Sequence, residues 1–407
     1  MSYLNHVFVG DCFKVLPKLP PDSVDLCVTS PPFWGLRSYG DNCVQIFGGD
    51  SLCQHEWIDT PPPRTRSEGD TINPDSKQNT VRGSNYNQKN GGFCEKCRAW
   101  RGQLGLEPHP QMFIDHLIEF GRLVRRVLKP SGLFWLNLGD TYCTGAGKSI
   151  SSGGDIDRGI EKIQPPSSPN RMVKLDGGWL QPKQLLMIPS RVACALQDDG
   201  WILRSDVIWY KPNHMPESVA DRFTKSYEHF FMFSKEQRYY FNLDEVREVS
   251  TSIPWSIDAG KYKTNNPRTT YKGKFLSEDT SQYTSPRARV LDRETPNFYN
   301  PMGKNPGDVW EIPTQPFPGS HFAVFPEELV KRIIKCSSPP QGVVLDPFAG
   351  SGTVLRVARR LGRSFIGIEL KPEYAEMAEQ RIRGRNFRKK NVGVKPLEYT
   401  LTESEEL

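Results

Sequence analysis

Residues 343–353 read Val-Val-Leu-Asp-Pro-Phe-Ala-Gly-Ser-Gly-Thr, an apolar run followed by a glycine-rich turn and then by a helical pattern. Glycines in a turn between a strand and a helix let the backbone approach a ligand closely. The next apolar run ends at Glu369, whose spacing from Gly350 suits an acid that holds ribose hydroxyls. The stretch predicts a nucleotide-type site, and an ordinary strand-to-helix turn is the alternative.

Asp346, the acid at the start of this turn, restricts which ligands the turn can bind. The turn does not read Gly-x-Gly-x-x-Gly, and a carboxylate at this place would repel a pyrophosphate group. The same carboxylate would attract an ammonium group. An adenosine with a cationic amino-acid tail fits both Asp346 and Glu369 better than a dinucleotide does. The sequence therefore predicts S-adenosylmethionine as the cofactor.

Short apolar runs alternate with helical patterns over much of the chain. Such alternation predicts βαβ units, and hence an α/β fold with a doubly wound, mostly parallel sheet. The expected strands are 7–9, 24–29, 133–138, 202–210, 229–233, 343–345 and 365–368. The expected helices are 112–128, 183–198, 353–361 and two that begin near Pro326 and Pro372.

A proline-rich loop, Thr-Ser-Pro-Pro-Phe-Trp at 29–34, ends the expected strand 24–29. Two successive prolines cannot donate to a sheet ladder, so the chain leaves the sheet at the edge where α/β proteins bind ligands. The Ser30 hydroxyl and the Pro31 carbonyl can accept hydrogen bonds from the amino group of a base, and Phe33 can stack on it. These bonds would favour a pyramidal, more nucleophilic nitrogen. A rigid turn with a core aromatic residue is the alternative.

The 407 residues carry a formal net charge of +6 and include 37% hydrophobic residues, which fits a globular protein and permits a nucleic-acid partner without requiring one. No apolar run is long enough to span a bilayer, and the N-terminal residues lack a signal-peptide pattern. The 9 cysteines, an odd number, favour reduced thiols over a disulfide framework. We therefore expect a cytoplasmic protein with no membrane partner.

Segments 346–353 and 29–34 together carry a family resemblance. They resemble the motifs of amino-group DNA methyltransferases, which modify cytosine N4 or adenine N6. The catalytic loop precedes the cofactor loop, which is similar to the permuted (beta) order of that family. Residues 10–11, 209–213 and 321–327 resemble other family segments, and the likeness covers roughly two thirds of the chain.

The resemblance implies a sheet of about seven strands, a target base flipped out of duplex DNA, and direct methyl transfer without a covalent enzyme intermediate. Double-stranded DNA is the implied partner, a cognate restriction enzyme is a second one, and the oligomeric state stays open. The implied catalytic residues are Ser30, Pro31, Pro32 and Phe33. The implied cofactor-binding residues are Asp11, Phe325, Asp346, Phe348, Gly350, Gly352 and Glu369.

Ser30 bears on which base is modified. Similar proteins with Asp or Asn at this position are mostly adenine-N6 enzymes, whereas Ser is associated mainly with cytosine N4. We therefore predict cytosine-N4 transfer, with adenine-N6 transfer as the alternative. A non-catalytic DNA-binding protein that keeps an inactive methyltransferase fold is a further alternative. An RNA or small-molecule methyltransferase is another.

Cysteines and a histidine flank the polar stretch 58–92, which has too few apolar residues to form a core. Cys53, His55, Cys94 and Cys97 offer three sulfur ligands and one imidazole, a set typical of tetrahedral structural zinc. Metal bonds would tether a segment that burial cannot hold. Unrelated cysteines are the alternative, because Cys43 is also nearby.

The patterns divide the chain into parts. We expect residues 1–244 to form the catalytic part of the methyltransferase domain that the resemblance implies, with 51–100 as a candidate zinc-binding insertion, and 306–385 to form its cofactor-binding part. Residues 245–305 interleave basic and aromatic side chains, which suits a region that reads DNA, with a solvated insertion as the alternative. Residues 386–407 form a charged tail.

Overall fold

A computed structural model describes residues 3–36, 38–59, 92–143, 180–181, 183–249, 302–315 and 324–384. The chain forms two compact units, one of Met1–Phe241 with Asp308–Leu407 and one of Asn242–Gly307. The predictions for the tail at 386–407 and for most of the DNA-reading region at 245–305 lie outside the described residues.

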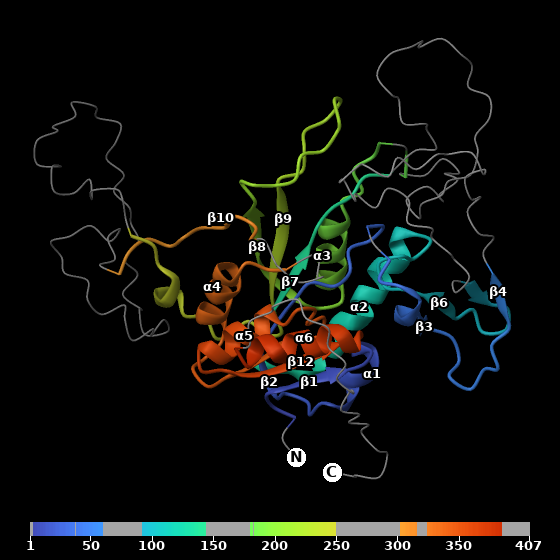
Figure 1. Cartoon of the computed structure of the whole chain (residues 1–407), viewed down its shortest axis with the longest axis horizontal. Coiled ribbons are helices and arrows are strands. Elements are labelled where there is room, and N and C mark those ends of the chain that lie inside the picture. The colour runs from blue at the N-terminus through green and yellow to red at the C-terminus, as the bar shows by residue number, and fades with distance from the viewer. Residues whose placement is uncertain are drawn as a thin grey trace, which may run out of the picture. The chain divides into compact units, whose positions relative to one another are not determined.

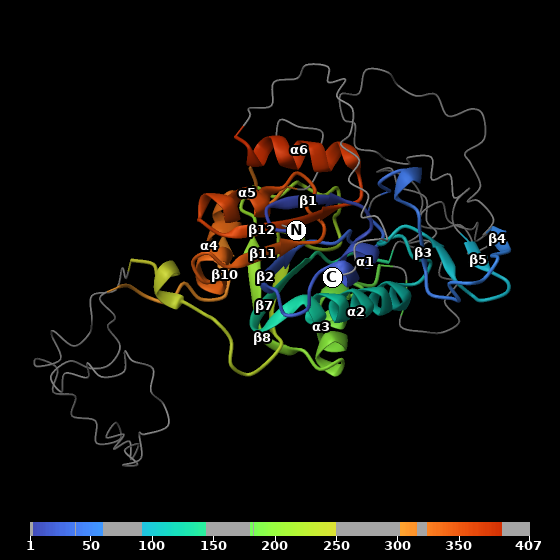
Figure 2. The same cartoon turned by 90° about the horizontal axis from the view of Figure 1, so that it is seen from below.

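The first unit is built on an eight-stranded sheet (Figures 1 and 2). Five neighbouring strands run parallel to one another. The strand Tyr227–Ser234 (β9) runs antiparallel to both of its neighbours, and the edge strand Val309–Glu311 (β10) runs parallel to its neighbour Ile202–Tyr210 (β8). The doubly wound, mostly parallel α/β class is confirmed, and short β10 adds a strand to the seven expected. In spatial order the strands are β1 (His6–Val9), β12 (Ser364–Glu369), β11 (Val343–Asp346), β2 (Val24–Thr29), β7 (Leu128–Leu138), β9 (Tyr227–Ser234), β8 (Ile202–Tyr210) and β10 (Val309–Glu311).

Helices cover both faces of this sheet, as Figure 2 shows. Phe134 and Leu136 of β7 pack in one apolar cluster with α1, α2 and α3, while Leu133 and Trp135 pack in the other with α4, α5 and α6. Successive strand residues point to opposite faces, so a strand covered on both sides reads as a continuous apolar run. The helices are α1 (Cys12–Val15), α2 (Pro110–Val127), α3 (Ile188–Asp198), α4 (Glu327–Ser337), α5 (Thr353–Arg360) and α6 (Pro372–Ile382).

The helix expected at 183–198 begins later than its pattern predicts. Met187 has a left-handed backbone with φ of 55°, and Pro189 occupies the first turn of α3. Proline fits a first helical turn because its missing N–H would have no partner there. The residues before it pair elsewhere, with Leu185 bridged to Tyr142.

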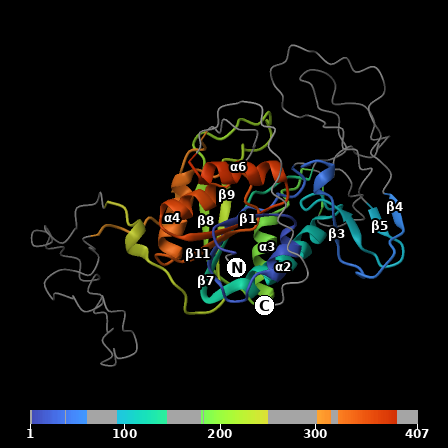
Figure 3. The ribbon, with the colours of Figure 1, turned by 60° about the horizontal axis from the view of Figure 1, so that its bottom comes forward.

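A second, antiparallel sheet was not predicted, because each of its strands is only three residues long. It contains β3 (Gln45–Phe47), β6 (Trp100–Gly102), β5 (Gly92–Cys94) and β4 (Trp57–Asp59), in that order. Figure 3 shows this sheet beside α2. Phe47 stacks on the His116 ring of α2, with ring centroids 4.3 Å apart, and Trp100 lies 5.7 Å from the same ring. The described ends of segment 58–92, residues 58–59 and Gly92, pair in this sheet, and the rest of the segment, on which the prediction of no core depends, lies outside the described residues.

The described part of the second unit is small. It contains a short 3-10 helix, η5 (Leu243–Val246), and an antiparallel bridge between Glu248 and Lys304. Arg247 forms an ion pair with Asp244 at 2.8 Å. In neither unit does a described helix combine the length and the apolar character needed to cross a bilayer.

Replacing Gly352 by alanine should lower the free energy of unfolding by about 2–3 kcal/mol. An added Cβ would lie 2.6 Å from the Cβ of Ala378 on α6, and Gly352 also has a left-handed φ of +75°. Gly362 is the matched control, since its φ is +71° but no atom lies within 4 Å of an added Cβ. Gly362→Ala should cost only about 1 kcal/mol, for backbone strain. Urea unfolding of both variants measures the difference, and equal losses would contradict the packing argument.

Candidate active site

The two loops that the sequence singles out meet at one edge of the central sheet. Strands β2 and β11 are parallel neighbours, with Leu26 opposite Val344. Where both strands end, the Thr29 hydroxyl donates to Asp346 Oδ1 at 2.7 Å, across 317 positions of sequence. The carboxyl ends of parallel strands are where α/β proteins bind ligands.

A cavity of about 710 Å³ opens at this edge, a size typical of small-molecule sites. It is lined from both halves of the chain. The predicted site residues that line it are Ser30, Pro31, Pro32, Phe33, Phe325, Asp346, Phe348, Gly350 and Glu369.

Asp11 and Gly352 do not line the cavity. Asp11 caps α1, where its carboxylate accepts the Phe13 N–H at 2.9 Å, while Gly10 and Cys12 on either side face the cavity. Gly352 packs against α6. Both residues therefore support the cavity wall.

The Asp346 carboxyl is buried at the centre of the site. Burial raises its pKa to about 7, and the nearby Glu369 charge adds to the rise, while hydrogen bonds from Thr29 and from the Phe348 N–H oppose it. Desolvation disfavours the charged form of an acid. A cation bound beside Asp346 would stabilise the carboxylate and offset this desolvation. The site suits a ligand with a positively charged end.

Backbone donors hold the second acid, Glu369, in one orientation. Its Oε2 accepts the Gly350 N–H at 2.8 Å, and its Oε1 accepts the Lys371 N–H at 2.9 Å. Burial raises the pKa of Glu369, and these N–H groups counteract the rise. A carboxylate has about four lone-pair sites, so each oxygen can accept a further bond from a ligand hydroxyl.

Ser30 is positioned by Asn137 of β7. The Ser30 hydroxyl donates to Asn137 Oδ1 at 3.0 Å, and Asn137 Nδ2 donates to the His229 carbonyl at 3.1 Å. A carbonyl only accepts, which fixes the amide orientation and makes Ser30 the donor. The Ser30 oxygen therefore keeps its lone pairs for a ligand. Asn137 was not among the predicted site residues, although an amide within the apolar run 133–138 was a usable signal.

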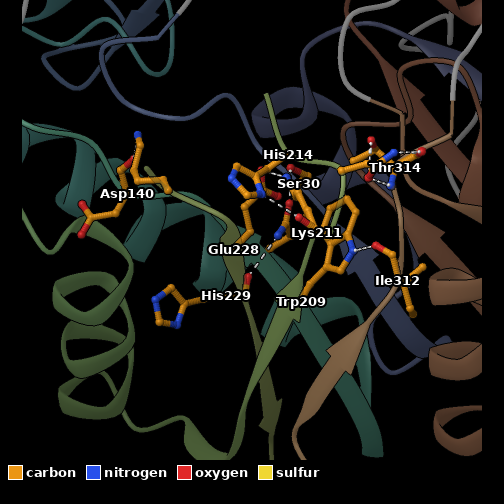
Figure 4. Close-up of polar contacts among 12 residues, drawn as sticks. Ser30, Asp140, Trp209, Lys211, His214, Glu228, His229, Ile312 and Thr314 are labelled. Atoms are coloured by element: carbon orange, nitrogen blue, oxygen red, sulfur yellow. Dashed lines mark hydrogen bonds and ion pairs between the residues drawn. The ribbon is translucent and has the colours of Figure 1, made fainter. Parts of the chain in front are cut away.

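The ends of β8 and β9 add a charged pair to the cavity wall (Figure 4). Lys211 forms an ion pair with Glu228, and its ammonium group lies 4.1 Å from the centre of the Trp209 ring. The Trp209 indole N–H donates to the Ile312 carbonyl at 2.7 Å, which ties β8 to the segment after β10. Residues 209–213 carry a family resemblance in the sequence, whereas Glu228 has no such signal, because its pairing with Lys211 depends on the tertiary fold.

The predicted metal ligands also come together, away from the cavity. The ligand atoms of Cys53, His55, Cys94 and Cys97 all lie within 4.8 Å of one another. Cys43, the nearby cysteine that raised the alternative, lines the cavity instead. The cluster is therefore a separate site of four residues.

Comparison with known proteins places the chain in a family. The family model described as DNA methylase, of the N6/N4 type, matches residues 24–380. The Type II methyltransferase M.SmaI of Serratia marcescens is 32% identical over 376 residues, covering 92% of this chain and 90% of that protein. The Type II methyltransferase M.Cfr9I of Citrobacter freundii is 33% identical over 380 residues, covering 93% and 88%.

Among solved structures, PvuII DNA methyltransferase (cytosine-N4-specific) is similar with a TM-score of 0.47 and 16% identity, over 95% of this chain and 87% of that one. The family match is the decisive comparison. It runs from β2 into α6 and includes both loops that line the cavity. The chain therefore belongs to the N6/N4 DNA methylase family.

Proposed function

We propose that the protein is a site-specific DNA methyltransferase that transfers a methyl group from S-adenosylmethionine to the exocyclic N4 of cytosine in duplex DNA. The observation that carries this proposal is a single cavity that is lined both by two buried acids, Asp346 and Glu369, and by Ser30 with its partner Asn137. We assign the acids to a cationic nucleoside and Ser30 to an amino group, and we call these two parts of the cavity the acid side and the Ser30 side.

The acid side holds the cofactor. Asp346 faces its ammonium group, and Glu369 accepts hydrogen bonds from its ribose hydroxyls. Phe348, whose ring centre lies 5.2 Å from that of Phe120, and Phe325, which packs 5.3 Å from Phe230, give the cavity fixed apolar walls. When bound there, S-adenosylmethionine supplies an electrophilic methyl carbon.

The Ser30 side holds a base flipped out of the duplex. The base amine donates its N–H bonds to the Ser30 oxygen and the Pro31 carbonyl, while Phe33 supports the ring. These hydrogen bonds localise the lone pair on nitrogen. The hydrogen bonds strengthen most as the new N–C bond forms. As the N–C bond forms, the S–C bond of S-adenosylmethionine would break with its electron pair on sulfur, and the amine nitrogen would release one proton to solvent.

Ser30 favours cytosine over adenine as the target, because a serine at this position of the motif resembles the cytosine-N4 enzymes. The relatives named above are Type II methyltransferases. We accordingly propose duplex DNA as the substrate and a restriction endonuclease of matching specificity as a companion of this protein.

Methylating plasmid DNA with the purified protein tests the reaction and the base together. Nucleoside mass spectrometry should show N4-methylcytosine, and single-molecule sequencing should place it at one recurring sequence. Detection of N6-methyladenine would overturn the choice of base. Absence of any methylated nucleoside would leave a DNA-binding protein with an inactive methyltransferase fold.

Ser30→Ala should lower kcat roughly 10²-fold, because the transition state loses a positioned hydrogen-bond acceptor. The dissociation constant of the cofactor should stay within about twofold, since the Ser30 hydroxyl bonds Asn137, whereas Asp346 and Glu369 are held by Thr29 and by backbone N–H groups. Ser23→Ala is the control, because its hydroxyl binds the Pro20 carbonyl and lies outside the cavity lining. Single-turnover kinetics and calorimetry separate the two effects. An equal loss of cofactor affinity would contradict a role confined to the base.

Cofactor affinity should rise with pH between 5.5 and 7.5, by up to about tenfold. The pKa of Asp346 is about 7, so at a pH below this value the carboxyl is mainly protonated and neutral. At a higher pH the carboxylate attracts the ammonium group. Asp346→Asn should bind more weakly and lose this pH dependence, whereas Asp22→Asn, which alters an exposed acid paired with Lys235, should keep it. Calorimetric titration at several pH values measures both. A pH-independent wild type would remove Asp346 from this role.

A further inference from the structure

Four metal-binding side chains form a compact cluster that methyl transfer does not use. The Cys53 and Cys94 sulfur atoms are 3.8 Å apart, and Cys97 Sγ is 3.3 Å from His55 Nδ1. A zinc tetrahedron with Zn–S bonds of about 2.3 Å has S–S edges of roughly 3.8 Å and S–N edges of roughly 3.6 Å. The cluster therefore has the dimensions of a tetrahedral zinc site, and its sulfurs are too far apart for a disulfide.

The backbone around Cys94 and Cys97 has the form of a tight turn. The Arg98 N–H donates to the Cys94 carbonyl at 3.0 Å, and the Cys94 N–H donates to the Ala99 carbonyl at 2.8 Å. Arg98 has a left-handed φ of 63°. Gly49 packs against this turn so closely that an added Cβ would lie 2.8 Å from Cys97 Sγ. The turn is held so that both sulfurs can reach one ion.

The small sheet that carries these ligands packs on α2 through Phe47 of β3 and Trp100 of β6, while the ligands lie at β5 and before β4, toward its other edge. Its four strands are three residues long, and Cys94 ends β5 while Cys53 and His55 precede β4. Sheets of this size are marginal in water without a further constraint. Metal–ligand bonds supply folding free energy where a core is too small. Four protein ligands also leave no open coordination position, so the role is structural.

The same sheet leads directly into the wall of the active site. After β6, the Gln103 side chain accepts the Tyr39 N–H at 2.9 Å and donates to the Gly40 carbonyl at 3.0 Å. The Gly35 N–H donates to the Gly105 carbonyl at 2.7 Å. Gln103 and Tyr39 both line the cavity. Segment 103–107 thus connects the sheet to the loop that follows Ser30.

A second set of contacts anchors this segment to α2. The Trp34 indole N–H donates to the Glu107 carbonyl at 3.0 Å. The buried Glu107 carboxylate accepts the Gly105 N–H at 2.9 Å and bonds His116 at 2.8 Å. His116 is the ring on which Phe47 of β3 stacks. A change in the small sheet therefore reaches the catalytic loop at two places.

We propose that Cys53, His55, Cys94 and Cys97 bind one structural Zn²⁺, which fixes the small sheet and, through segment 103–107, holds the loop after Ser30 against the cavity. The proposal is independent of which base the enzyme methylates. It assigns to the metal the shape of the site and no step of the reaction.

Metal analysis of the full-length protein, purified under reducing conditions without chelator, tests the first part. We expect about one zinc per chain, and visible d–d bands of a tetrahedral thiolate site after cobalt replaces zinc. Cys94→Ser and Cys97→Ser should reduce the zinc content at least fivefold, while Cys194→Ser, an exposed cysteine of α3, should keep it. Wild-type protein without stoichiometric zinc, or variants with unchanged zinc, would overturn the site. The cobalt spectrum of the wild type decides the matter even if the variants fail to fold.

Hydrogen exchange before and after chelation of the wild type tests the second part. Zinc removal should increase exchange in the small sheet, in 103–107 and in 33–40, and leave α4 to α6 unchanged. Added zinc should restore protection. Unchanged exchange at 33–40 after the metal has left would overturn the link to the catalytic loop. Because neither readout is methylation, failure here is distinguishable from failure of the proposed function.

Discussion

The pairing of β2 with β11 is the constraint on which the site depends. It places Thr29 beside Asp346 with a hydrogen bond of 2.7 Å, although 317 positions separate them in sequence. Both strands end at the same edge of the sheet, so Ser30 and Phe348, from the loops that follow them, line one cavity. Parallel strands that end at a common edge make this possible, and no local sequence feature could achieve it.

The site combines two electrostatic environments within one cavity. Asp346 is buried enough that its pKa rises to about 7, so it gains most from a cationic ligand. Ser30 is neutral, and its hydroxyl proton is already used by Asn137. Under the proposed function, Asp346 would favour a positively charged group and Ser30 an uncharged amine, as transfer from a sulfonium to a base nitrogen requires.

The sequence predicted the parts of the fold whose signals are local. Continuous apolar runs located β2, β7 and β11, because strands covered on both faces contain few polar residues. The small sheet had no such signal, since three-residue strands show no periodicity. Site residues in motifs were found, whereas Asn137 and Glu228 were missed because their roles come from partners on other strands. Asp11 was identified by its motif and serves as a helix cap.

The parallel pairing of β1 with β12 has a consequence for synthesis on the ribosome. Strand β1 (His6–Val9) hydrogen-bonds to β12 (Ser364–Glu369), and β2 hydrogen-bonds to β11 in the same way. During synthesis these strand edges stay open until residues 343–369 emerge, and such long-range closure slows folding. A nascent chain that stopped before residue 343 would contain the proline-rich loop but neither Asp346 nor Glu369.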